Sequence, residues 1–498
     1  MAIAILLIAT SLLFIPSSSV LTHLLSQPQE PQAYTSILIS EQGLDFVKSL
    51  LITKAISSAI PLHIPRIHRS IKFPFLGSVD VELSNITIYE IGVSSSLVKP
   101  GETGVSIIAS GTTCNLSMDW EYDYFSWVFP FDVSDKGKAT VQVEGMDIEL
   151  TLGVENNQGT LNLNLMECSC SVKNISIKLV GGASWLYQGM INAFQEQIGS
   201  AVENAITKSL KEGICKLDSV LQSLPREIPV DDYASLNATF LNNPSLSNSS
   251  IGFDINGLFR AREKDPSHKL FSKNSLSSVI CSDNLKMLGI SLDEEVFNSA
   301  STLYYDAEFM HWIVDKIPDQ SLLNTAGWRF IIPQLYKKYP NDDMNLNITL
   351  SSPPIIKISD HNIDATIYAD LTIDVLHESR VIPVACISLV IRGSGSVSIS
   401  GNNLTGNVKL NDFTMSQNWS EIGNLHLYLI QPVMRTLIQT VFMPFANTHL
   451  SNGFPLPVIH GFTLEDGEII CTESKITVCS DVSYSDTFVL NRSLIYSQ

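Results

Sequence analysis

The apolar and polar positions along the chain predict a unit made of a helix, several strands and a longer helix. Residues 40–60 begin with a serine, stop before Pro61 and carry apolar side chains at every third or fourth position, which is typical of an amphipathic helix. Between residues 73 and 179 apolar and polar side chains alternate instead, as in half-buried antiparallel strands. Residues 185–210 carry one continuous apolar stripe and are predicted to form a second, longer helix.

The second half of the chain repeats this order. Ser291 is predicted to cap a helix, residues 363–375 alternate without a slip as one strand, and residues 425–446 form the second long apolar helix. The connection between the halves, residues 224–250, is rich in Pro, Asn and Ser. The repeated order indicates a duplication into two α+β units, each a strongly twisted sheet wrapped around two helices.

Composition and net charge narrow the class of protein. The chain has 498 residues, enough for two to four domains, and 45% of them are apolar, as in ordinary folded proteins. Thirty-one basic residues stand against fifty acidic ones, which gives a formal net charge of −19. Because a chain this acidic cannot neutralise a track of phosphates, no nucleic acid is expected as a partner.

Residues 1–19 are expected to be a cleaved secretory signal peptide. They carry no charge, and an apolar run is followed by small residues suited to cleavage before Val20. A membrane anchor is the alternative, although the run is short for a bilayer core. The expected location is extracellular, with the vacuole as an alternative. Nine Asn-x-Ser/Thr sequons are candidate glycosylation sites of a secreted chain, at Asn85, Asn115, Asn174, Asn237, Asn248, Asn347, Asn403, Asn418 and Asn491.

The sequence motifs do not indicate an enzyme. No G-x-S-x-G, H-E-x-x-H or phosphate-binding loop pattern occurs, and the ten histidines are scattered. Cysteine and histidine spacings typical of a zinc site are missing as well. We therefore expect no catalytic activity, no cofactor and no metal.

Six short motifs occur in order along the mature chain, and each alone is weakly specific. They are Ile39-Ser40-x-x-Gly43-Leu44-Asp45, Val143-Glu144-Gly145-Met146, Gly182-x-x-Trp185-Leu186, Leu288-Gly289-Ile290-Ser291, Ser352-Pro353-Pro354 and Gly453-Phe454-Pro455-Leu456-Pro457. Together they make the chain resemble the family of bactericidal/permeability-increasing protein (BPI) and lipopolysaccharide-binding protein (LBP), in particular its plant members. The resemblance covers nearly all of the mature chain.

The resemblance implies a tubular lipid-binding fold. Two elongated, strongly twisted antiparallel β-barrels, each wrapped around two helices, are joined by a central sheet into a boomerang shape. The first barrel is expected over residues 34–222, a linker that contributes to the central sheet over 223–252, and the second barrel over 253–498. The resemblance also implies a monomer that binds lipopolysaccharide and phospholipids and meets the outer-membrane surface of bacteria.

Two kinds of lipid site follow from the same resemblance. Each barrel is expected to hold one lipid in an apolar pocket between its sheet and its helices, although ordinary core packing is the alternative for such residues. The expected pocket residues are Phe46, Leu50, Tyr187, Ile191, Phe194, Ile198, Phe297, Leu429, Val433 and Leu437. The tip of the first barrel is expected to hold the phosphates of lipid A, with a solvated turn as the alternative. The basic residues expected there are Lys54, Arg66, Arg69, Lys72, Lys136 and Lys138.

Residues 119–127 depart from the family, because acids and aromatics stand where the bactericidal members carry basic residues. Asp119, Glu121 and Asp123 would repel phosphates, whereas the aromatic residues between them suit acyl chains or a membrane interface. Two functions therefore remain. The first is a secreted protein that recognises bacterial lipopolysaccharide in innate antibacterial defence. The alternative is a carrier of host phospholipids without lipopolysaccharide specificity.

The resemblance also implies one disulfide, Cys168–Cys215, between a strand and the long helix. Cys170 is the rival partner of Cys215, since it lies on the same face of the strand. Cys471 and Cys479 are candidates for a second bridge across a hairpin. The pairing of Cys114, Cys281 and Cys386 stays open.

Overall fold

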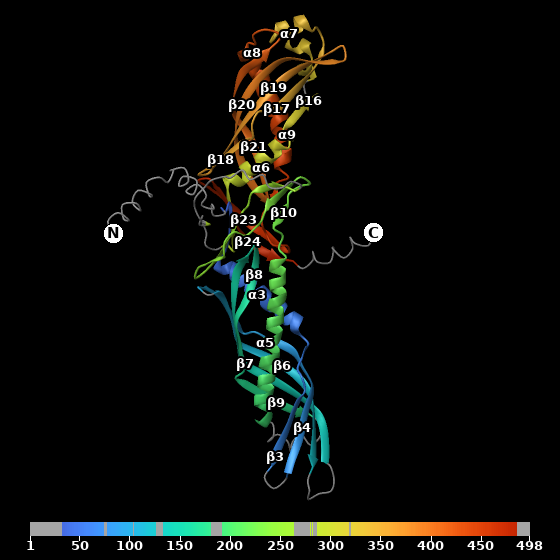
Figure 1. The fold of residues 1–498 in the computed structure, drawn as a ribbon, viewed down its shortest axis with the longest axis vertical. Coiled ribbons are helices and arrows are strands. Elements are labelled where there is room, and N and C mark those ends of the chain that lie inside the picture. Colours follow the sequence, from blue (N-terminus) through green and yellow to red (C-terminus); the bar gives the residue numbers. More distant parts are fainter. Residues whose placement is uncertain are drawn as a thin grey trace, which may run out of the picture.

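The computed structural model describes residues 32–73, 77–102, 104–125, 133–180, 192–262, 279, 281, 286–317 and 320–485. These residues form an elongated molecule in which two curled antiparallel sheets lie end to end with a central sheet between them (Figure 1). The chain begins in the middle, builds the lower barrel, returns along a long helix, builds the upper barrel and ends in the middle again. The α+β architecture of two barrels and a central sheet is confirmed.

The lower barrel is an eight-stranded antiparallel sheet that curls around one long helix. The strands lie in the order β2-β4-β6-β7-β8, with β3 on β4, β5 on β6 and β9 on β7. The inner face of the sheet packs against the helix through buried side chains such as Leu116, Val143 and Ile198. The elements are α3 (Glu41–Ala59), β2 (Leu62–His63), β3 (Ile67–Phe73), β4 (Gly77–Gly92), β5 (Ser95–Gly101), β6 (Gly104–Phe125), β7 (Val133–Asn157), β8 (Thr160–Ser171), β9 (Asn174–Val180) and α5 (Asn192–Gln222).

A bulge at Asn85 shifts the alternation of β4. Asn85 has a positive φ of 53°, and the register between β4 and β6 slips between Ser84 and Thr87. The bulge adds one residue to β4, so the side chain of Ile86, three positions after Leu83, again points to the inner face. Leu83 and Ile86 are therefore both buried. The strand therefore keeps one apolar face along its whole length.

The upper barrel repeats the arrangement with a seven-stranded sheet. Its strands lie in the order β16-β17-β19-β20-β21-β22, with β18 on β19, and a broken helix crosses the inner face. The elements are α6 (Glu294–Asp306), β16 (His311–Val314), the short helices η2 (Gln320–Leu323), η3 (Thr325–Trp328) and α7 (Pro333–Lys338), β17 (Asp343–Leu350), β18 (Ile355–Ser359), β19 (Asn362–His377), β20 (Arg380–Ser400), β21 (Asn403–Ser420), α8 (Leu427–Leu437), a π-helical turn (Ile438–Phe442), α9 (Met443–Leu450) and β22 (Phe454–Pro455).

The central sheet combines strands from both ends of the chain. Its order is β12-β13-β1-β15-β24-β23, all antiparallel. A separate three-stranded sheet, β10-β11-β14, lies beside it. The bounds are β1 (Thr35–Ile39), β10 (Glu227–Pro229), β11 (Ala234–Asn237), β12 (Ser245–Leu246), β13 (Ile251–Ile255), β14 (Phe259–Ala261), β15 (Leu288–Asp293), β23 (Phe462–Thr472) and β24 (Lys475–Tyr484).

The helix expected at residues 40–60 forms as α3, with Ser40 as its N-cap. The cap predicted for α6 is wrong, because Asp293, not Ser291, accepts from the backbone N–H of Glu295. Ser291 lies in β15 instead, opposite Thr477 of β24, since Leu288, Ile290 and Leu292 alternate as a strand.

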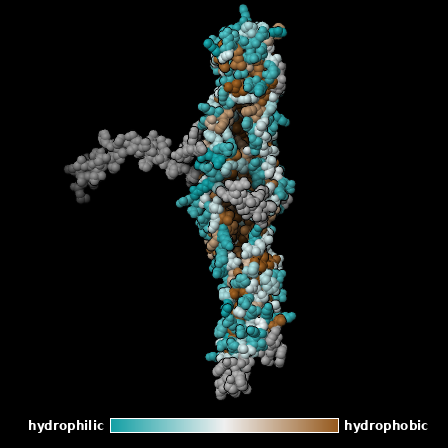
Figure 2. Space-filling view, turned by 90° about the vertical axis from the view of Figure 1, so that its right-hand side faces the viewer, coloured by the Kyte–Doolittle hydropathy of each residue, from teal (hydrophilic) through white to brown (hydrophobic). Residues whose placement is uncertain are grey.

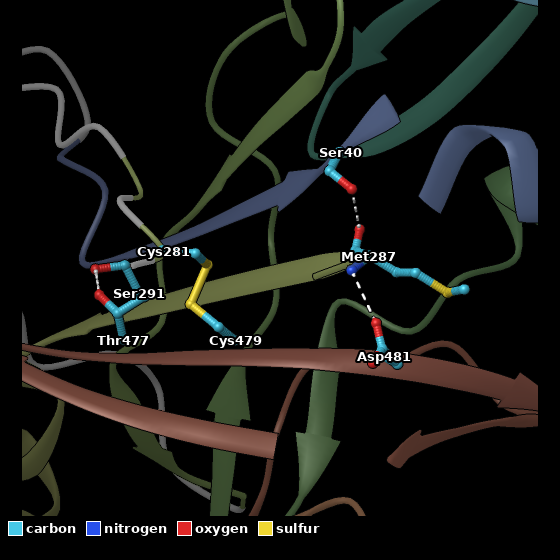
Figure 3. The surroundings of a disulfide bond; sticks show 7 residues. All are labelled: Ser40, Cys281, Met287, Ser291, Thr477, Cys479 and Asp481. Atoms are coloured by element: carbon cyan, nitrogen blue, oxygen red, sulfur yellow. Dashed lines mark hydrogen bonds between the residues drawn. A yellow bond between two sulfur atoms is a disulfide. The ribbon is translucent and has the colours of Figure 1, made fainter. Parts of the chain in front are cut away.

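The disulfide of the structure joins Cys281 to Cys479 (Figure 3). Gly289, which pairs with Cys479, leaves the space for it: a β-carbon at this position would lie 3.2 Å from the Cys281 sulfur. The expected Cys168–Cys215 bridge is absent and both thiols are free, as is the rival Cys170. Burial raises the pKa of the Cys168 thiol, and the charge of Lys211, which lies one helical turn before Cys215, partly opposes this effect.

The Cys471–Cys479 bridge is wrong for a related reason. Cys479 is already bonded to Cys281, and the register of β23 and β24 places Cys471 opposite Ile476 and Cys479 opposite Glu468. Cys471 is therefore a free thiol. In the part of the chain that the structure describes, no helix is both long enough and apolar enough to span a membrane.

Candidate functional site

An apolar cavity lies in the upper barrel between the sheet and the broken helix. From the sheet it is lined by Val314, Leu346, Ile348, Ala369, Leu371, Leu389 and Ile391, and from the helix by Met434, Leu437, Ile438, Val441 and Phe442. Every lining residue is apolar, so the cavity suits hydrocarbon and offers no partner to a polar group. The space open to the centre of a water molecule is about 20 Å³, so an acyl chain enters only if the walls move apart.

The wall that the helix supplies is irregular where it meets the cavity. Pro432 lies inside α8 and removes one backbone donor, and the π-helical turn Ile438–Phe442 widens the next turn. Three residues of that turn, Ile438, Val441 and Phe442, line the cavity. A helix with fewer regular hydrogen bonds at this point is the part of the wall best able to move.

The expected pocket residues of the upper barrel are divided between several environments. Leu437 lines the cavity, and Val433 packs against the same core. Leu429 is instead partly exposed at the start of α8. Phe297 belongs to a different cluster next to the central sheet, where its ring meets that of Phe454 at 5.9 Å. One of the four expected residues therefore lines the cavity.

In the lower barrel the expected pocket residues lie in the core or beside the central sheet. Phe194 and Ile198 of α5 are buried in the core of the barrel. Phe46 is half-buried on α3, and its ring meets Phe462 of β23 at 6.5 Å. Leu50, also on α3, is half-buried. Tyr187 and Ile191 lie outside the described residues, as do the signal segment 1–19 and the motif at 182–186.

The molecular surface is hollowed in both halves. Figure 2 shows hydrophobic side chains inside two recesses, one on either side of the middle of the molecule. The upper recess is on the side of the barrel that carries α9, which faces right in Figure 1. Apolar side chains are therefore within reach of solvent in each half.

The basic residues expected at the lower tip do not form one cluster. Lys54 lies at the central sheet, where its ammonium is 5.4 Å from the centre of the Tyr484 ring. Arg66 forms an ion pair with Glu82 at 3.3 Å. Arg69 lies opposite Val81 on the inner side of the edge strand β3, whereas Lys72 is exposed opposite Ser78.

The remaining two expected cations of the lower tip are paired with acids by the strand register. Lys136 of β7 lies opposite Glu121, and Lys138 lies opposite Asp119 of β6. Opposite charges in such positions stabilise a sheet by about 0.2–1 kcal/mol and cancel each other's field. Two of the expected cations therefore lie beside acids in the part of the lower tip that the structure describes.

Two aromatic residues of this region point inward, away from any membrane contact. They belong to β6, where Trp120 and Tyr122 are buried and stack with ring centres 6.3 Å apart. The Trp120 indole N–H donates to the carbonyl of Lys138 at 3.1 Å. These two rings are part of the core of the barrel; Trp127 and the Phe125 side chain lie outside the described residues.

Two cysteine thiols inside the lower barrel have raised pKa values. Burial raises the pKa of the Cys114 thiol to about 11 and, together with Glu203 and neighbouring thiols, that of Cys170 to about 12. Both thiols are protonated at neutral pH and are poor nucleophiles. Among the described residues, no group of three or more His, Cys, Asp or Glu side chains is arranged to hold a metal ion.

The sequons differ in accessibility. Asn237 is 2% exposed, and a buried amide has no room for a glycan, so this fold does not favour glycosylation there. Asn347 is half-buried between His311, at 2.7 Å, and Asp374. The sequons at Asn85, Asn174, Asn248 and Asn418 are exposed, those at Asn115 and Asn403 are half-buried, and Asn491 lies outside the described residues.

The sequence reasoning missed most of the cavity wall. Strand residues such as Leu346 and Leu389 carry the alternation that predicts an inward face, but alternation does not distinguish a cavity wall from packed core. Pro432 inside an apolar helical run was the one local signal of the irregular wall.

Comparison with known proteins places these features in a family. The chain matches the LBP / BPI / CETP family, N-terminal domain, over residues 43–224, and the C-terminal domain of the same family over residues 229–484. A BPI/LBP family protein of Arabidopsis thaliana is 63% identical over 462 residues, covering 93% of this chain and 95% of the relative. Human lipopolysaccharide-binding protein is 23% identical, covering 91% of this chain and 94% of the relative.

A crystal structure of lipopolysaccharide binding protein has the same fold. It superposes with a TM-score of 0.63 at 20% identity, covering 91% of this chain and 99% of that one. Both domain matches lie in the order that the duplicated helix–strand pattern predicts. With its two barrels, its apolar cavity and these matches over most of its length, the chain belongs to the LBP / BPI / CETP family of lipid-binding proteins.

Proposed function

We propose that this protein is a secreted, non-enzymatic lipid-binding protein that recognises bacterial lipopolysaccharide and acts in antibacterial defence. The observation that carries the lipid-binding part is the wholly apolar cavity under α8 and the π-helical turn. Each buried CH₂ group of an acyl chain contributes about 0.8 kcal/mol, which offsets the cost of parting the walls once several carbons are inside. The cavity thus favours a flexible chain over a rigid apolar ring.

Two features support lipopolysaccharide as the lipid. Relatives over nearly the whole chain bear the names lipopolysaccharide-binding protein and bactericidal permeability-increasing protein. Lipid A also supplies several acyl chains to a molecule that has a recess in each half. Head-group binding at the lower tip contributes less in this proposal, because Arg66, Lys136 and Lys138 face acids.

The acids opposite Lys136 and Lys138 also favour a second candidate, a carrier of host phospholipids. A carrier needs the apolar cavity and needs no dense phosphate-binding patch. The two candidates differ in whether lipopolysaccharide competes with a bound phospholipid for the protein.

Lipids that accompany the secreted protein, identified by native mass spectrometry, test both candidates. Titration with lipopolysaccharide and with phosphatidylcholine should then show tighter binding of lipopolysaccharide. Ala369→Met, which fills the cavity, should weaken binding of both lipids, whereas Ala365→Met on the same strand, outside the lining, should not. Phospholipid binding without lipopolysaccharide binding would favour the carrier function. Equal lipid binding by the Ala369→Met and Ala365→Met variants would show that the cavity is not the lipid site.

A further inference from the structure

The far end of the upper barrel is a compact surface that we call the upper tip. It consists of residues 320–340, the turn between β19 and β20, and residues 421–429. The ring of Tyr339 meets that of His377 at 5.6 Å, and the Lys338 ammonium donates to the carbonyl of Glu421 at 3.4 Å. These contacts hold the three segments together at the top of Figure 1, where α7 and the start of α8 lie.

Large apolar side chains are exposed on the upper tip. Phe330 is 77% exposed and Tyr428 70%. The segment that carries Phe330 is nevertheless firmly held, because Trp328 and Leu335 on either side of it are fully buried. The Phe330 ring is therefore exposed to solvent although the backbone that carries it is fixed by buried neighbours.

Basic side chains surround the exposed ring. Residues 320–340 contain three bases and no acid, in a chain whose net charge is −19. The Arg329 guanidinium lies 4.6 Å from the centre of the Phe330 ring, and Lys337 and Lys338 are exposed in the last turn of α7.

The other two segments of the upper tip carry acids, so its positive charge is concentrated on residues 320–340. Glu378 lies in the β19–β20 turn and Glu421 in residues 421–429, while Asp342, just beyond residue 340, forms an ion pair or hydrogen bond with His377 at 2.7 Å. Among the described residues at the lower end, by contrast, the Trp120 and Tyr122 rings are buried, and Lys136 and Lys138 each face an acid.

We infer that the upper tip docks this protein on the surface of an anionic phospholipid bilayer. Phe330 and Tyr428 suit the boundary between head groups and acyl chains, while Arg329, Lys337 and Lys338 meet lipid phosphates. Helix α8 starts at this tip and reaches the cavity at Met434 and Leu437. Docking places the movable wall of the cavity next to the bilayer. The inference does not depend on which lipid occupies the cavity.

Vesicle flotation with the full secreted protein tests the charge contribution. The parent should bind vesicles of phosphatidylcholine with phosphatidylglycerol at low salt, and binding should weaken as salt screens the attraction. The variant R329E/K337E/K338E should bind at least about tenfold more weakly, because each basic residue near an anionic surface contributes about a fivefold gain. The control K178E/K208E/K216E changes the net charge equally at exposed residues of the lower half and should bind as the parent does.

A second variant keeps the test independent of charge. Phe330→Ser, at a residue too exposed to affect folding, should weaken vesicle binding several-fold at both salt concentrations, whereas Val220→Ser on α5 should not. No binding of the parent to anionic vesicles, or equal loss in the control charge variant, would overturn the inference. If light scattering shows that the parent is a dimer and that Phe330→Ser makes it a monomer, the inference is also overturned, and this face is assigned to self-association.

Discussion

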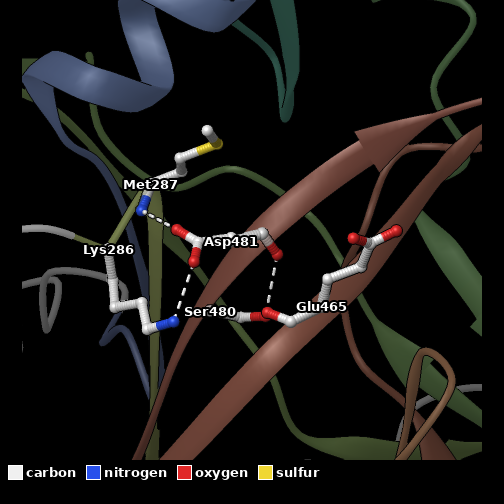
Figure 4. Close-up of polar contacts among 5 residues, drawn as sticks. All are labelled: Lys286, Met287, Glu465, Ser480 and Asp481. Atoms are coloured by element: carbon white, nitrogen blue, oxygen red, sulfur yellow. Dashed lines mark hydrogen bonds and ion pairs between the residues drawn. The ribbon is translucent and has the colours of Figure 1, made fainter.

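Ser40 and Met287, 247 positions apart in the sequence, meet at a single carbonyl oxygen (Figure 3). The Ser40 N–H donates to the Met287 carbonyl at 3.0 Å, and the Ser40 hydroxyl donates to it at 3.3 Å while it accepts from Gly43 as the cap of α3. Met287 and Lys286 in turn both contact the Asp481 carboxylate, the lysine at 2.8 Å (Figure 4). The first helix is thereby fixed to strands from the second half and the end of the chain.

Gly43→Ala should destabilise this junction. A β-carbon at residue 43 would lie 2.3 Å from the Met287 carbonyl oxygen, so α3 would have to move away from Met287 and weaken the Ser40 contacts. We expect a loss of about 1–3 kcal/mol in the free energy of unfolding, measured by urea titration. Gly213→Ala on α5 is the matched control: nothing lies within 4 Å of the new β-carbon, and a gain of about 1 kcal/mol is expected. Equal changes in the two variants would contradict the prediction.

Removing the Cys281–Cys479 disulfide should destabilise the chain more than removing a free thiol. The bond joins residues 198 positions apart, and loop entropy sets an upper limit of about 5 kcal/mol on its contribution. Cys281→Ala should therefore lower the melting temperature and the secreted yield, while Cys215→Ala, at an exposed thiol, should change neither. Non-reducing peptide mapping decides the pairing directly, and a Cys168–Cys215 peptide would show this assignment to be wrong.

The hydrogen bond from Tyr304 to Asp231 should make stability depend on pH. Its length is 2.6 Å. Partial burial acts to raise the pKa of Asp231, but this bond and the N–H groups of Ala234 and Tyr233 outweigh it, so the pKa is lowered. Since an unfolded Asp has a pKa near 3.9, the stabilisation is present above about pH 4 and is lost as pH falls through the folded pKa.

Tyr304→Phe removes that contribution. We expect a loss of about 1 kcal/mol at pH 7, at the low end for a charged acceptor because Asp231 is exposed, and a smaller difference from the parent at pH 3. Urea titrations at the two pH values measure it, with Tyr89→Phe at an exposed position as the control. A difference that does not shrink in acid would refute the linkage.

Glycan occupancy should follow exposure rather than the sequon alone. Asn248 is exposed between β12 and β13, whereas the buried Asn237 uses its side-chain oxygen to accept from the N–H of Thr239 at 3.0 Å. Glycopeptide mapping of the secreted protein should find a glycan on Asn248 and none on Asn237. Accordingly, Asn248→Gln should lower the mass by one glycan, and Asn237→Gln should leave the glycan mass unchanged. A glycan on Asn237 would show that this strand is not buried in the secreted protein.

The sequence predicted the elements that depend on local periodicity. Residues 40–60 and α3 differ by one residue at each end, and the strand predicted at 363–375 lies within β19. The helix expected at 425–446 is divided by a π-helical turn, which apolar spacing does not reveal because a wider turn still keeps apolar residues on one side.

Features that depend on strand register could not be predicted from the sequence. Spacing along the chain does not show which residues lie opposite Lys136 and Lys138. Only the pairing of β6 with β7 places Glu121 and Asp119 there. Cys281 and Cys479 likewise meet because β24 pairs with β15. Neither partner is encoded by spacing along one segment, so no single-sequence pattern could have selected them.

The position of β1 in the central sheet has a consequence for synthesis on the ribosome. This strand, which precedes both barrels in the sequence, lies between β13 and β15, and the sheet is extended by β24 and β23, which follow both barrels. The lower barrel can therefore complete itself early, but both edges of β1 stay unpaired until residues of the second half have been made. We therefore expect the central sheet to close last, and we expect a chain cut after the lower barrel to expose both edges of β1 to pairing with other chains.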